Sequence, residues 1–165
     1  MKYTNEKVRR QDRLMIEEDA LNLLKSSEFG VLSLYSKEDE GGYGIPVNYV
    51  WDGKHSLYIH CAPEGKKLRC IIDNPHVSFC IIGRVNLLPD KFTTEYESIV
   101  MKGEARFPLP DEEKKKALEA ILDKFSPDDK VIGKKYAEKS FHRVELIRID
   151  ITEWSGKCKH VPHAD

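Results

Sequence analysis

The chain has 165 residues, and its 27 Lys and Arg against 28 Asp and Glu leave a formal net charge of −1. This length predicts one domain over residues 1–165, with residues 153–165 as a C-terminal tail. The balanced charge excludes a general attraction to nucleic acid or to an anionic membrane. No apolar run approaches the roughly 20 residues that cross a bilayer, and the polar start at 1–12 is unlike a signal sequence, which favours a cytoplasmic protein.

The first predicted elements are a helix and a strand. Three acids, Glu17 to Asp19, stand where the positive end of a helix dipole favours them, and leucines follow at helical spacing. This helix should end near Ser27, because the segment from Phe29 to Tyr35 has the composition of a mostly buried strand. The charged, glycine-containing segment 36–42 predicts an exposed turn.

The segment from Tyr43 to Trp51 has the clearest strand pattern, with large apolar residues alternating with Gly44, Pro46 and Asn48. Pro46 restricts it to a position where its missing N–H is harmless, such as a sheet edge. Asp52-Gly53 is a turn signal, and residues 56–61 can return as a strand, so we expect a hairpin.

The middle of the chain continues with a short helix that begins near Glu64 and stops at Asp73-Asn74-Pro75. Its apolar face is expected to carry Leu68, Ile71 and Ile72. Strands are predicted at 77–82 and 97–106, joined by an irregular connection at 84–96.

The last third predicts one long helix and one strand. The helix begins near Asp111 and carries Leu118, Ile121, Leu122 and Phe125 at helical spacing. The strand runs from residue 143 to 152, before a polar tail. About six strands and three helices without regular alternation indicate an α+β fold built on an antiparallel barrel.

The four cysteines lie far apart in the chain, with no C-x-x-C pair: Cys61, Cys70, Cys80 and Cys158. We expect reduced thiols, mostly in the core. In the tail, Cys158, His160 and His163 could together ligate zinc or copper, but no evident fourth ligand accompanies them, and no metal site is predicted.

The junction between residues 58 and 69 has the composition of an anion site. A strand runs into a glycine-containing turn, and Lys66, Lys67 and Arg69 open the helix that follows. Free backbone N–H groups, the helix dipole and two ammonium groups suit a phosphate dianion. The alternative is that paired lysines simply face solvent, as they usually do.

Several blocks, in this order and spacing, resemble the pyridoxamine 5′-phosphate oxidase-related flavoproteins, and most of all their nitroimidazole-resistance (Nim-type) branch. The blocks are Phe29-Gly30-Val31-Leu32, Ile45-Pro46-Val47-Asn48-Tyr49-Val50-Trp51-Asp52-Gly53, Leu57-Tyr58-Ile59-His60-Cys61-Ala62, Gly65-Lys66-Lys67-Leu68, Asn74-Pro75-x-Val77, Tyr96-x-Ser98-Ile99-Val100-x-x-Gly103-x-Ala105 and Thr152-Glu153-Trp154-Ser155-Gly156-Lys157. Together they cover nearly the whole chain.

The resemblance implies an FMN-binding split barrel that forms a homodimer, with one flavin in each of two clefts between the subunits. It implies that Lys66 and Lys67 hold the phosphate together with the backbone of His60, Cys61 and Ala62. Other residues are expected around the cofactor: Pro46, Val47, Asn48 and Tyr49 along the isoalloxazine ring, and Tyr96, Ser98 and Trp154 from the second subunit.

His60 is the one candidate catalytic residue. In the branch that the chain resembles, a histidine at this point lies near the flavin, where it could donate a proton to a reduced substrate or position an acidic group. The alternative is that it merely fixes the turn or hydrogen-bonds the phosphate. Cys61 beside it is expected to be a small buried filler rather than a redox thiol.

Two functions follow from these expectations. The first is a flavin-dependent oxidoreductase that reduces small electron-poor compounds such as 5-nitroimidazoles. The alternative is a non-catalytic storage or sensor module that holds FMN, FAD or haem in the same fold. Oxidation of pyridoxamine 5′-phosphate itself is disfavoured, because no second basic cluster is present to hold a substrate phosphate.

Overall fold

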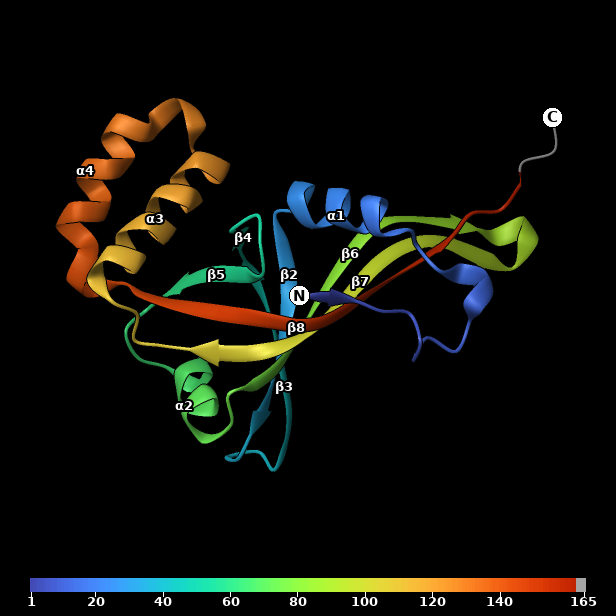
Figure 1. Cartoon of the computed structure of the whole chain (residues 1–165), viewed down its shortest axis with the longest axis horizontal. Coiled ribbons are helices and arrows are strands. Elements are labelled where there is room, and N and C mark those ends of the chain that lie inside the picture. The colour runs from blue at the N-terminus through green and yellow to red at the C-terminus, as the bar shows by residue number, and fades with distance from the viewer. Residues whose placement is uncertain (163–165) are drawn as a thin grey trace.

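A computed structural model describes residues 1–162 of the chain (Figure 1). Within them, strands join into one sheet in the order β3-β2-β6-β7-β8-β5-β4, and β1 pairs in parallel with β8. The strands are β1 (Lys2–Tyr3), β2 (Phe29–Ser36), β3 (Gly41–Asn48), β4 (Val50–Trp51), β5 (Ser56–Cys61), β6 (His76–Leu88), β7 (Thr93–Arg106) and β8 (Glu145–Lys159). The α-helices are α1 (Glu17–Ser26), α2 (Lys66–Asp73), α3 (Asp111–Phe125) and α4 (Lys130–Ser140).

The sheet is that of a split barrel. Every ladder except β1–β8 is antiparallel, and β3 contacts β5 without forming a ladder with it. The inward side chains form a continuous apolar core, in which the rings of Tyr49 and Phe79 meet edge to face at 5.2 Å. The predicted α+β class and antiparallel barrel are confirmed.

The expected hairpin of residues 43–51 with 56–61 is only partly correct. Tyr49 and Val50 are consecutive and both buried, so the alternation ends there and the strand is divided in two. The first part, β3, pairs with β2, and only β4 pairs with β5. Pro46 does lie on the end strand of the sheet, opposite Val31, as its missing N–H requires.

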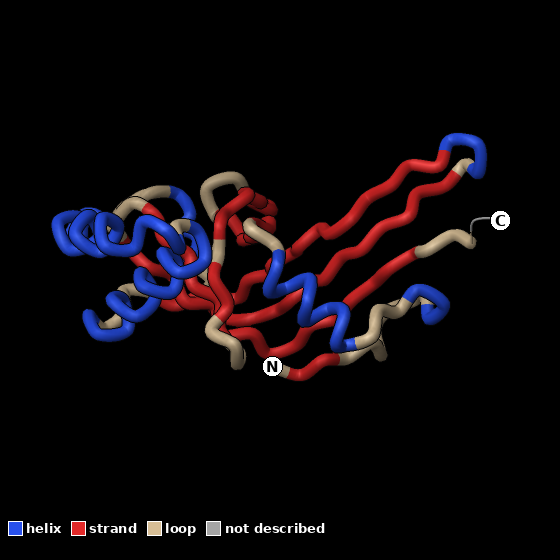
Figure 2. Tube along the Cα trace, turned by 90° about the horizontal axis from the view of Figure 1, so that it is seen from above, coloured by secondary structure: helices blue, strands red, loops and turns tan. Residues whose placement is uncertain are grey.

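The predicted irregular connection at 84–96 is wrong. Strands β6 and β7 continue through it as a long hairpin with a bulge between Ile82 and Val85, and only residues 89–92 turn. The outer part of this hairpin extends away from the body (Figure 2). Because several of its apolar and polar side chains are exposed on both faces, it lacks the one-sided alternation that marks a half-buried strand.

The expected tail at 153–165 is also wrong for its first part, since β8 continues to Lys159. Lys102 pairs with Glu153 and Gly103 with Ile151, which leaves Thr152 as an extra residue. This bulge shifts the inward positions by one, and Trp154 becomes a core residue with 1% of its surface exposed. A Cβ at Gly103 would collide with the carbonyl oxygen of Asp150, so the bulge requires glycine there.

The helices lie outside the sheet. Helices α3 and α4 gather at the end opposite the tip of the β6–β7 hairpin (Figure 2), and α4 was not predicted. The predicted apolar face of α2 is wrong at one position. Leu68 and Ile71 are buried as expected, but the helix turns Cys70 inward and leaves Ile72 exposed. Within residues 1–162, no helix is both long and apolar enough to span a membrane.

Candidate functional site

The junction between β5 and α2 is built around Gly65. Its φ of +145° and ψ of 169° lie in a region that only glycine occupies readily. From there the Gly65 carbonyl accepts the N–H groups of Leu68 and Arg69 and starts α2. No side chain caps the helix, so backbone donors at its start are free to meet an anion.

The two lysines of this junction point to different neighbours. Lys66 forms an ion pair with Asp39, in the turn between β2 and β3, and its Nζ lies 4.7 Å from the centre of the Tyr43 ring. The ion pair with Asp39 raises the pKa of Lys66. The next turn of the helix repeats the arrangement, since Arg69 pairs with Glu38 at 2.6 Å.

Lys67 lies on the side of β5. Its charge acts on His60 and Cys61 at the end of that strand, and within residues 1–162 its side chain forms no ion pair or hydrogen bond. The pKa of His60 is lowered by burial and then by Lys67. Burial raises the pKa of the Cys61 thiol despite the same lysine.

The predicted ring-lining segment is divided between two sides of β3. Pro46 and Asn48 face outward, and the Asn48 amide donates to the Glu28 carbonyl at 3.1 Å. Val47 is half-buried. The ring of Tyr49 lies in the core, where its hydroxyl donates to the Leu24 carbonyl at 2.6 Å and burial raises its pKa. Only the outward residues and the backbone of this segment can contact a bound ring without rearrangement.

Tyr96, Ser98 and Trp154 are not brought to this junction within one chain. Tyr96 and Ser98 lie on β7, where they pair with Val85 and Ile82 of β6. The tip of the β6–β7 hairpin lies far from α2 along the long axis (Figure 1). Trp154 packs edge to face on Tyr3 at 4.8 Å. A site that uses both groups needs a second copy of the chain.

An open strip of apolar side chains crosses the outer face of the sheet beside β3. Cross-strand partners place Pro46, Val31, Cys80 and Val100 in one row. The neighbouring row carries the exposed side chains of Phe29 and Ile82.

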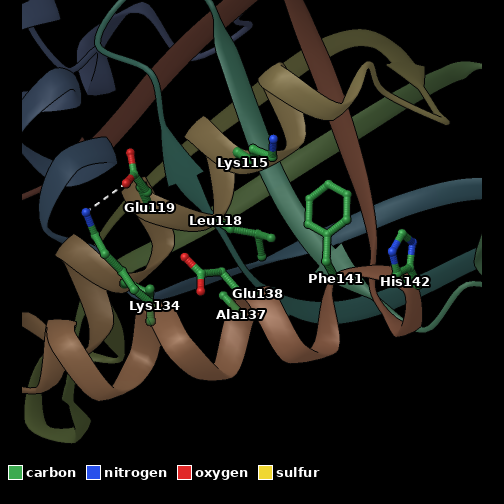
Figure 3. A pocket seen from close by; sticks show the side chains of 9 residues that line it. Lys115, Leu118, Glu119, Lys134, Ala137, Glu138, Phe141 and His142 are labelled. Atoms are coloured by element: carbon green, nitrogen blue, oxygen red, sulfur yellow. Dashed lines mark ion pairs between the residues drawn. The ribbon is translucent and has the colours of Figure 1, made fainter.

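The hollows of the single chain lie elsewhere. One, of about 470 Å³, separates α3 from α4, with Leu118, Ala137 and Phe141 along it and a Lys134–Glu119 ion pair at one end (Figure 3). Another, of about 580 Å³, follows the sheet past Ser78 and Gly103.

The remaining predictions concern thiols and metals. All four cysteines are free. Among residues 1–162, no group of three His, Cys, Asp or Glu is arranged to hold a metal ion. His163 lies outside the described residues.

The sequence interpretation missed the acids of the β2–β3 turn. Glu38 and Asp39 had been predicted only as part of an exposed turn, and the structure pairs both with basic residues of α2. The three consecutive acids from Glu38 to Glu40 were visible in the sequence. Only the fold brings two of them to basic residues that lie 27 and 31 positions away in the chain.

The sequence pattern of the family described as pyridoxamine 5′-phosphate oxidase matches residues 17–158. The chain belongs to this family. The match spans the elements from α1 to β8, including both halves of the junction, and it bears out the resemblance seen in the sequence.

Solved structures share the fold. One is a protein from Bacteroides thetaiotaomicron named as a candidate 5-nitroimidazole antibiotic resistance protein, with a TM-score of 0.74, 20% identity, and coverage of 88% of this chain and 86% of that one. A FAD-binding protein from Mesorhizobium loti has a TM-score of 0.65 and 20% identity, covering 90% and 98%. A FAD and haem binding protein from Mycobacterium smegmatis has a TM-score of 0.70 and 19% identity, covering 93% and 76%. No curated protein matches the chain.

The residues at the junction fit a flavin phosphate. A free ammonium group, an uncapped helix start and a glycine without a side chain lie together. On β3, Gly44 and Pro46 leave the outer face low enough for a flat ring to approach.

Proposed function

We propose that this protein is a homodimeric flavoprotein that binds FMN between its subunits and reduces small electron-poor compounds, of which 5-nitroimidazoles are an example. The observation that carries the proposal is the unpaired Lys67 beside His60 at the uncapped start of α2. This arrangement offers a charge and free N–H groups to a phosphate.

The homodimer accounts for the division of the predicted site. His60 and Lys67 lie where β5 meets α2, whereas Tyr96 and Ser98 lie on β7, so a two-fold arrangement would let each cleft draw on both subunits. The open apolar strip on the outer sheet face supports such a contact, because burying exposed side chains such as Ile82 and Phe29 is favourable.

In this site the flavin would supply the electron transfer, and the protein would hold and orient it. His60 is the residue proposed for catalysis. Burial and then Lys67 lower its pKa, which favours the neutral imidazole beside Lys67. In that form its ring N–H would donate to the reduced substrate or position an acidic group of it.

The absorbance spectrum of the purified protein tests the cofactor. We expect a flavin spectrum, either as purified or after FMN is added. A colourless protein that takes up no FMN would contradict the proposal.

Reaction with a nitroimidazole tests the reductase. The flavin is reduced anaerobically and the compound is then added, and we expect reoxidation together with loss of the nitro absorbance. A flavin that stays reduced would instead favour the storage or sensor function. His60→Ala should keep its flavin and react more slowly, which separates a chemical role from a binding role.

A further inference from the structure

The hollow between α3 and α4 has the size and lining of a ligand site. Leu118, Leu122 and Ala137 supply apolar side chains, and the ring of Phe141 stands toward one end (Figure 3). Its volume of about 470 Å³ is that of a site for a small organic molecule. None of its lining residues belongs to the β5–α2 junction, so within one chain the hollow is separate from the proposed flavin site.

Packing on both sides holds the hollow in place. Leu118 of α3 packs on the small core cluster that contains Leu146 of β8. Gly133 lets α4 lie close against α3, because a Cβ there would come within 2.7 Å of a methyl group of Leu122. The two helices are thus fixed to the sheet and to each other, and a ligand would find the hollow already formed.

The charged side chains of the lining differ from one end of the hollow to the other. Glu119 pairs with Lys134 at 2.8 Å, and the charge of Glu138 acts on the same lysine. Lys115 and His142 lie toward the opposite end (Figure 3). The acids of the lining are therefore gathered around Lys134, and the opposite end carries basic groups.

Lys114 adds an available cation at the basic end. The residue is only 9% exposed, and its Nζ lies 4.5 Å from the centre of the Phe141 ring. Among residues 1–162, its ammonium group forms no ion pair or hydrogen bond, whereas Lys115 pairs with Glu112 at 3.3 Å. A largely buried ammonium group without a carboxylate is stabilised when an anion is brought to it.

We propose that the hollow between α3 and α4 binds a small aromatic carboxylate. The ring of the ligand lies on Leu118 and Ala137 and against Phe141, since aromatic rings pack well on one another and on apolar side chains. Its carboxylate lies at the basic end, where the ammonium groups of Lys114 and Lys115 donate to it. This site is additional to the flavin site and does not depend on it.

Three probes of one shape test the charge of the ligand: phenylacetate, 2-phenylethanol and 2-phenylethylamine. Binding to the full-length protein is followed by NMR at the methyl groups of Leu118 and Ala137, which line the hollow. We expect phenylacetate to bind at least about fivefold more tightly than the alcohol, and the amine to bind most weakly. Equal affinities for the three probes, or methyl signals that none of them moves, would overturn the proposal.

Two lysines of α3 test the assigned cation. Lys114→Met removes the charge but keeps an unbranched side chain, and we expect it to weaken phenylacetate binding about fivefold and to leave 2-phenylethanol binding unchanged. Lys116→Met is the matched control, because Lys116 is exposed and outside the lining. Lys114→Arg keeps the charge and should retain phenylacetate. Equal affinities in Lys114→Met and Lys116→Met, or a loss in Lys114→Arg as large as in Lys114→Met, would contradict the role of the ammonium group.

Excess FMN separates this hollow from the flavin site. Because the lining residues lie apart from the β5–α2 junction, the affinity for phenylacetate at the Leu118 methyl groups should be the same with and without FMN. Displacement of phenylacetate from these methyl groups by FMN would contradict a separate site. Unchanged binding of phenylacetate to a protein that takes up no flavin would leave this proposal standing while the proposed function fails.

Discussion

At the residue scale, the difference between Lys66 and Lys67 comes from tertiary contacts. Both are lysines at the start of one helix, and sequence analysis had assigned them the same role. The fold places an acid beside the first and a histidine beside the second. Charge at a single residue is therefore available for binding only where the surrounding chain leaves it unpaired.

The pKa of His60 gives a residue-scale prediction. Burial and Lys67 both lower it from its ordinary value of 6.5, so Lys67→Gln should raise it, as measured by an NMR pH titration of the imidazole. Because the folded state binds this proton less tightly than the unfolded chain, His60 destabilises the fold as the pH falls through and below 6.5. Asp39 offsets the charge of Lys66, so Lys66→Gln should change the pKa of His60 less. An unchanged pKa of His60 in Lys67→Gln would contradict the assigned contact.

Gly65 gives a second prediction at the residue scale. Alanine at a φ of +145° is strained, and we expect Gly65→Ala to lower the free energy of unfolding by about 1–3 kcal/mol, measured by denaturant titration. Gly42→Ala is the control, because nothing lies within 4 Å of the added Cβ and its φ is not positive. Equal stability of the two variants would show that the turn before α2 relaxes.

At the element scale, α3 is attached to the sheet by a polar cluster. Glu113 accepts hydrogen bonds from Tyr58 at 2.9 Å and from Arg148 at 2.8 Å, and Arg148 also contacts Asp150. The pKa of Tyr58 is raised to about 12, mainly by burial and next by the hydrogen bond to Glu113. The cluster is three-quarters buried at Glu113 and Arg148, so it holds the helix more firmly than surface pairs do.

Removing Glu113 should therefore loosen α3. We expect Glu113→Ala to lower the free energy of unfolding by about 1–3 kcal/mol, because Tyr58 and Arg148 lose a partner in a partly buried place. Glu112→Ala is the control: its side chain is 81% exposed and pairs with Lys115, and a change within about 0.5 kcal/mol is expected. Thermal unfolding followed by circular dichroism compares them, and similar losses would show that the cluster adds no stability.

Element boundaries were predicted well where one side of the chain is buried. The start of α1 at Glu17, β2 from Phe29 and β5 at 56–61 agree with the sequence patterns. The outer part of the β6–β7 hairpin and the end of β8 were missed, since one is exposed on both faces and the other changes parity at a bulge. Helix α4 was missed because Val131, Ile132 and Tyr136 are exposed and give no inward stripe.

At the scale of the whole molecule, the proposed homodimer depends on the outer sheet face. Val100 is 42% exposed at the β7 end of the apolar strip, whereas Val131 on α4 is 72% exposed and outside it. Val100→Lys should shift a dimer to monomer and weaken flavin retention, while Val131→Lys should leave both unchanged. Light scattering after size exclusion, with flavin absorbance recorded on the same run, checks both. A monomeric wild-type protein that retains flavin would contradict the shared cleft.

The sequence by itself determined the α+β class and the family resemblance, and it marked the β5–α2 junction as the candidate site, because these follow from local periodicity and from residues close in the chain. Only the tertiary structure decided that β3 pairs with β2, that Trp154 is in the core, and that Asp39 occupies Lys66. Each of these depends on a bulge, a break in alternation or a contact between distant residues. Local patterns do not carry such information, since strand pairing and charge pairing are chosen by the packing of the whole chain.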